Sequence, residues 1–195
     1  MVWATGMHRP GYDAWREPVS VLSLGPAGAW SRLELLLFAA CVAVFGQALA
    51  RVMPGRRPGW SGRWASRAVL SAAAALVVLG LCVMDDVSYG EDGALVGRRT
   101  LEGGVHIVAS AALALLLVAH CALSAGYLRR AGAVVWSCAS ATCALAGLTA
   151  VVGYLVVTLD GRGPAGLLER GAIVVMGLHG ALVAAWFLRG ERVPA

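Results

Sequence analysis

Five long runs of apolar residues constrain the fold of this chain more than any other feature. They extend over Leu33–Val52, Ala65–Met84, Val105–Leu128, Val134–Thr158 and Leu167–Leu188. About 20 such residues are enough to cross the hydrocarbon core of a bilayer. Lipid offers no hydrogen bonds to the backbone, so each run is expected to be a helix. We therefore predict an all-α fold, a polytopic transmembrane bundle of about five spans.

The composition also indicates a membrane protein rather than a soluble one. Of the 195 residues 59% are hydrophobic and 14% are charged, and the mean hydropathy is +0.74. Soluble domains rarely combine these values. The net charge of +5 comes from arginines that stand beside the apolar runs, where basic residues set membrane orientation. We expect membrane lipids as partners and no nucleic acid.

The positions of the arginines predict the orientation. The connection 51–67 holds five arginines and no acid, which is typical of a cytoplasmic loop in the cell membrane. Successive connections between spans must lie on opposite sides of the membrane. The N-terminal segment (1–32), with its interfacial stretch, is therefore expected outside, and the tail (189–195) in the cytoplasm. The bundle itself covers residues 33–188. The acidic loop 85–104 is extracytoplasmic in this scheme.

Cysteines and histidines give no metal or cofactor signature. The five cysteines lie inside apolar runs without paired spacing, so we interpret them as small buried residues. His106 and His120 are separated by about 21 Å along one helix and cannot share a metal. We interpret His120, His179 and Gln47 as hydrogen-bonding residues. The acidic string 85–92 offers oxygen ligands for Mg²⁺ or Ca²⁺ but matches no established motif, so no metal is predicted.

Four short motifs resemble those of a bacterial and archaeal membrane family, domain of unknown function 998. They are the run from Arg9 to Trp30 (RPGYDAWREPVSVLSLGPAGAW), Met84–Asp86 at the end of one span, Gly104–His106 at the start of the next, and Gly166–Arg170 (GLLER). The resemblance implies one further helix before the first motif, hence six spans, whereas eight residues precede it here. Either the true start codon lies upstream, or a partner or lipid replaces that helix.

Polar residues of these motifs and of the outer loops form our candidate site, because topology places all of them at the outer ends of the spans. The expected catalytic residues are Asp85, His106 and Arg170. The expected substrate-binding residues are Arg9, Asp13, Arg16, Glu17, Asp86, Asp160 and Glu169. Two interpretations compete: a solvated rim of paired charges, or a polar mouth above an apolar bundle that binds a lipid or isoprenoid.

Function is less constrained than fold. Walker, His-Glu-x-x-His, Cys-x-x-Cys and Gly-x-Ser-x-Gly motifs are absent from the sequence. We expect an integral membrane protein with an outward polar site that is structural or binds lipid. A homo-oligomer or a helix-supplying partner is compatible with this. The alternative is an intramembrane enzyme of the cyclase or hydrolase type, which acts on a lipid or isoprenoid with Asp85 as general acid or base.

Overall fold

The computed structural model describes residues 11–25, 28–53, 60–85, 87–89, 95–97, 100–160 and 163–189. Its elements are the 3₁₀ helix η1 (Val19–Ser23), the helices α2 (Gly28–Val52) and α3 (Trp60–Leu81), the strands β1 (Val87–Tyr89) and β2 (Leu95–Gly97), and the helices α4 (Leu101–Arg130), α5 (Val134–Asp160) and α6 (Ala165–Leu188). Arg9 and Asp86 lie outside the described residues, so the structure does not place them.

The predicted helical fold is confirmed. Among the described residues, five helices are long and apolar enough to cross a membrane, and they coincide with the five apolar runs. The first begins at Gly28, somewhat earlier than the predicted start at Leu33. The loop after α3 also contains a small antiparallel hairpin, β1 paired with β2, which the sequence analysis did not predict. Three-residue strands are too short to show a clear alternation of side chains.

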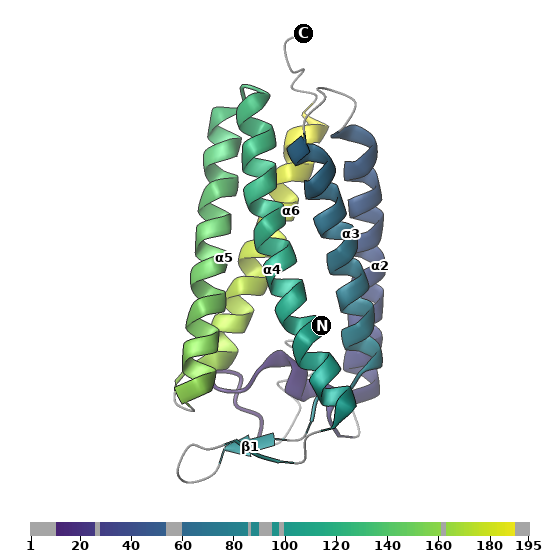
Figure 1. Cartoon of the computed structure of the whole chain (residues 1–195), viewed down its shortest axis with the longest axis vertical. Helices are drawn as coiled ribbons and strands as arrows, with labels where there is room; N and C mark the ends of the chain where they lie inside the picture. Colours follow the sequence, from purple (N-terminus) through teal and green to yellow (C-terminus); the bar gives the residue numbers. More distant parts are fainter. Residues whose placement is uncertain are drawn as a thin grey trace.

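The five helices run up and down in an elongated bundle (Figure 1), and each packs against the next in sequence. Helix α6 also contacts α4, whereas no Cα atom of α2 comes within 8 Å of one in α6. At one end lie η1, the hairpin and the first turns of α4 and α6. We call this the polar end, because most of the predicted site residues belong to it.

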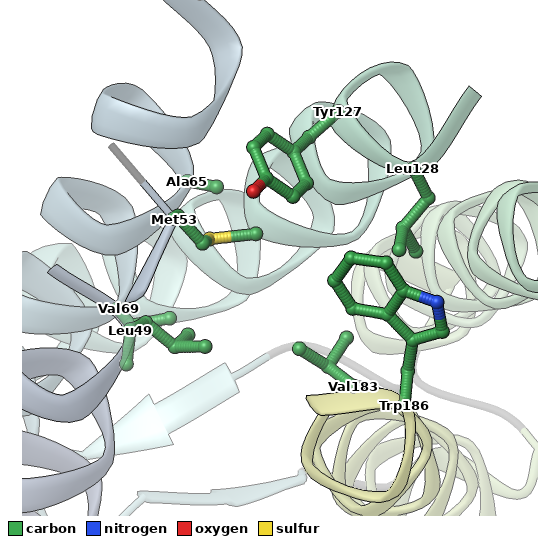
Figure 2. Packing of buried hydrophobic residues seen from close by; sticks show 8 residues of the cluster. All are labelled: Leu49, Met53, Ala65, Val69, Tyr127, Leu128, Val183 and Trp186. Atoms are coloured by element: carbon green, nitrogen blue, oxygen red, sulfur yellow. The ribbon is translucent and has the colours of Figure 1, made fainter. Parts of the chain in front are cut away.

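The main apolar core lies toward the opposite end. Figure 2 shows the eight buried residues that form this cluster; they come from α2, α3, α4 and α6, and from Met53 directly after α2. Trp186 is 2% exposed, and its ring packs edge-on against Tyr127 at 6.2 Å between centroids. A smaller cluster around Ala39 and Leu76 joins α2, α3 and α4. The helices that carry the polar end are thus anchored at their far ends.

Small residues allow close approach of helices at some positions and leave open space at others. A Cβ on Gly46 would lie 2.9 Å from the side chain of Leu70 of α3, so a larger residue would require Leu70 to shift. Gly177, in contrast, has nothing within 4 Å of an added Cβ. The prediction that the cysteines are buried is also wrong for Cys41 and Cys138, which are exposed on the surface of the bundle. Apolar residues of a span can face lipid as readily as the protein interior.

Candidate functional site at the polar end

The N-terminal segment docks on the first turn of α6. The backbone N–H groups of Gly166 and Leu167 donate to the carbonyl oxygens of Arg16 (3.2 Å) and Trp15 (3.1 Å). The first N–H groups of a helix have no partner within the helix, so the segment caps α6. A Cβ on Gly166 would overlap the carbonyl oxygen of Glu17. Only glycine permits this approach, which explains the first residue of the GLLER motif.

Arg170, one turn further along α6, also holds this segment. It is 5% exposed, and its Nη1 donates to the carbonyl oxygens of Ala14 at 2.8 Å, Gly166 at 3.0 Å and Glu17 at 3.2 Å. Its Nη2 donates to the hydroxyl of Tyr12. Charge-assisted hydrogen bonds of this kind are stronger than neutral ones. The guanidinium is therefore engaged with backbone of the N-terminal segment.

Two further contacts complete this docking. The carboxylate of Glu169 accepts a hydrogen bond from the backbone N–H of Val19, at the start of η1. The hydroxyl of Tyr12 donates to the carbonyl oxygens of Glu17 and Pro18, each at 3.2 Å. Burial raises the pKa of Tyr12 above its usual value, while Arg170 opposes that shift. Tyr12 thus stays protonated at neutral pH and can both donate and accept.

Charged residues on the outside of the segment form a rim. Asp13 accepts from the backbone N–H of Trp15 at 2.9 Å, and Arg16 approaches Asp13 at 3.9 Å. Their side chains are 52% and 76% exposed, so this ion pair contributes at most about 1 kcal/mol. Glu17 accepts from the backbone of Asp13 at 3.2 Å. Asp160, at the end of α5, is exposed.

A second cluster joins the end of α3 to the start of α4. Asp85 accepts hydrogen bonds from the hydroxyl of Thr100 (2.6 Å) and from its backbone N–H (3.1 Å). Thr100 is also the N-cap of α4, because its hydroxyl accepts from the N–H of Gly103. A Cβ on Gly103 would overlap the carboxylate of Asp85. Glu102 reaches back to accept from the N–H of Val83 at 2.7 Å.

His106 lies one turn further along α4 and is 3% exposed. Its Nδ1 is 2.8 Å from the carbonyl oxygen of Cys82. A carbonyl can only accept, so Nδ1 carries the hydrogen, and Nε2 of the neutral ring is an acceptor. No described residue hydrogen-bonds to Nε2. In the part of the chain that the structure describes, no three His, Cys, Asp or Glu residues are grouped to hold a metal ion.

The predicted residues thus form two clusters. Arg170, Glu169 and Glu17 meet at the start of α6, and Asp85 and His106 both contact residues at the junction of α3 and α4. A single site that contains Asp85, His106 and Arg170 stays a prediction.

Sequence reasoning missed Tyr12, Thr100 and Glu102. A threonine directly before an apolar helix is a recognisable N-cap signal and could have identified Thr100. Tyr12 lies within the first motif, but nothing in the sequence distinguishes its role. Glu102 is two residues after the cap, and its contact with Val83 depends on how the loop returns.

The clusters pair the motifs on which the resemblance rests. The first motif docks on GLLER, and the end of α3 docks on the start of α4. A family model described as a protein of unknown function, DUF998, matches residues 1–186. The chain belongs to the DUF998 family. No characterised protein and no solved structure matches this DUF998 chain.

Proposed function

We propose that this DUF998 protein is a non-enzymatic integral membrane protein in which the polar end is a structural cap. The observation that carries the proposal is the engagement of buried Arg170 with three backbone carbonyl oxygens. A guanidinium used in this way orders the N-terminal segment over the bundle. Asp85 has a comparable role at the start of α4, where it accepts from both polar groups of Thr100.

Orientation is part of the proposal. The arginine-rich connection 51–67 favours a cytoplasmic location for that end of the bundle. The polar end then faces outward, in the cell membrane, with the cap at the level of the lipid head groups. A cap at this depth covers the helix ends and satisfies backbone groups that the first turn of a helix leaves unpaired.

Asp85→Asn tests the cap directly. It keeps the shape of the side chain but removes the charge and one of two acceptor oxygens. We expect a lower melting temperature in detergent and a lower folded yield. Asp160→Asn is the matched control, because Asp160 is an exposed carboxylate at the same end. Equal melting temperatures for the two variants would contradict the structural role of Asp85.

One observation favours a second candidate function, the intramembrane enzyme. His106 combines a fixed Nδ1–H with an unpaired Nε2 acceptor, the arrangement that a general base requires. A lipid or isoprenoid substrate would have to place an exchangeable proton at Nε2. The carbonyl oxygen of Cys82, which accepts from Nδ1, would then support the charge that develops on the ring.

His106→Asn separates the two functions. The amide nitrogen of asparagine can replace Nδ1 and keep the bond to Cys82, while Nε2 is removed. His106→Gln is the complement, because its longer amide reaches the position of Nε2 instead. An enzyme predicts that cells with His106→Asn lose a lipid change that the wild-type protein produces, as seen by mass spectrometry of lipid extracts, with normal melting temperature. Identical lipid profiles for the wild-type protein, His106→Asn and a deletion strain would exclude the enzyme and support the cap.

A further inference from the structure

A buried pair of histidines lies inside the bundle, away from the polar end. His120 on α4 and His179 on α6 have ring centroids 5.0 Å apart and planes inclined at 75°. The two residues are 3% and 1% exposed, respectively. Ionisable residues within transmembrane helices are costly and commonly mark a functional feature. The proposed cap does not use either of them.

Each ring uses one of its two nitrogens. Nδ1 of His120 is 3.0 Å from the carbonyl oxygen of Ala65 on α3, so Nδ1 carries the hydrogen and Nε2 of the neutral ring is an acceptor. Nε2 of His179 is 3.1 Å from the hydroxyl of Ser140 on α5. The other two nitrogens, Nε2 of His120 and Nδ1 of His179, have no hydrogen-bond partner among the described residues.

A third unpaired polar group accompanies the pair. Ser124 follows His120 by one helical turn and therefore projects from the same side of α4. It is 0% exposed, and its hydroxyl has no partner among the described residues. Buried polar groups in proteins are nearly always hydrogen-bonded, to protein or to ordered water. Three such groups on facing surfaces of α4 and α6 point to a common partner.

The surroundings favour a small neutral partner over a cation. The described residues contain no group of three metal-binding side chains, and a cation held only by neutral ligands in an apolar interior is costly. A water molecule can donate a hydrogen bond to Nε2 of His120. It can also donate to Nδ1 of His179 or accept from it, depending on which tautomer His179 adopts. Buried waters typically make about three hydrogen bonds.

Gly180, next to His179 on α6, has open space on the side toward α2. Gly180 follows His179, and a Cβ placed on it would meet only Phe45 of α2, at 4.0 Å. The Phe45 ring is in turn 6.4 Å from the ring of His120. Since no Cα atom of α2 lies within 8 Å of one in α6, side chains close this part of the bundle.

We propose that one ordered water molecule binds between His120 and His179, with the Ser124 hydroxyl as its third partner. The water links α4 to α6, and the opposite nitrogens link the same rings to α3 and α5. It thereby connects four helices through one polar site at a depth where bulk water is absent. This inference is independent of the cap.

A double-mutant cycle tests the bridge. His120→Asn keeps a nitrogen for Ala65 and removes Nε2, and His179→Gln keeps a nitrogen for Ser140 and removes Nδ1. Either change removes one partner of the water. We expect each to lower the melting temperature in detergent, and the double variant to lower it by clearly less than the sum of the two shifts. Additive shifts would overturn the proposal.

A control cycle accounts for the lost ring volume. His106→Asn makes the same change as His120→Asn elsewhere on α4, and any shift in melting temperature that it causes should add to that of His179→Gln. If the variants do not fold, an experimental density map of the wild-type protein decides. Density for one water within hydrogen-bonding distance of both nitrogens is expected. A directly packed pair, or a stoichiometric metal found by elemental analysis, would refute the proposal.

Discussion

Arg170→Gln is the sharpest perturbation of the cap. The wild-type guanidinium donates to three backbone carbonyl oxygens, and glutamine can replace about one of these bonds. Hydrogen bonds to a charged group contribute about 1.5–3 kcal/mol each. Ala14 is exposed and Glu17 is half-buried, so water can replace part of the loss at their carbonyl groups. We therefore expect the variant to be less stable by about 2–4 kcal/mol.

Two assays in detergent separate local release from global destabilisation. At roughly 2–4 °C per kcal/mol for a chain of this size, the melting temperature should fall by about 5–15 °C. Limited trypsin digestion should cut after Arg16 faster in the variant, because the docked backbone is released. Arg16→Gln is the control for the melting experiment, since its side chain is 76% exposed. If Arg170→Gln and Arg16→Gln have the same melting temperature, Arg170 does not hold the N-terminal segment in place.

Three further predictions concern other parts of the molecule. Gly103→Ala should lower the melting temperature, because its Cβ overlaps the carboxylate of Asp85, whereas Gly104→Ala has free space and should gain up to about 1 kcal/mol of helix propensity. Trp186→Ala should cost about 3–5 kcal/mol in thermal unfolding, with little effect of the same change at Trp30, which is 68% exposed. An alkaline phosphatase fusion should be active in the acidic loop 85–104 and inactive in the basic loop 51–67; the reverse would overturn the proposed orientation.

The sequence by itself determined the helices. Five apolar runs of sufficient length have one stable solution in hydrocarbon, so the element type and approximate bounds followed from composition and length. The charges of the polar end were also recognisable, because their positions beside the spans follow from topology. Their partners were not, since Arg170 binds carbonyl oxygens some 150 residues earlier, and any residue type supplies such oxygens.

Only the tertiary structure decided which polar residues meet. It brought the first motif onto the start of α6. It also explained Gly166 and Gly103, since at each of them an added Cβ would collide with another part of the chain. It also brought together His120 of α4 and His179 of α6, although the whole of α5 lies between them in the sequence. Helical periodicity fixes which residues share a face of one helix. The rotation of a helix toward its neighbours depends on packing, and there small residues and buried hydrogen bonds outweigh hydrophobicity, because lipid and protein interior are equally apolar.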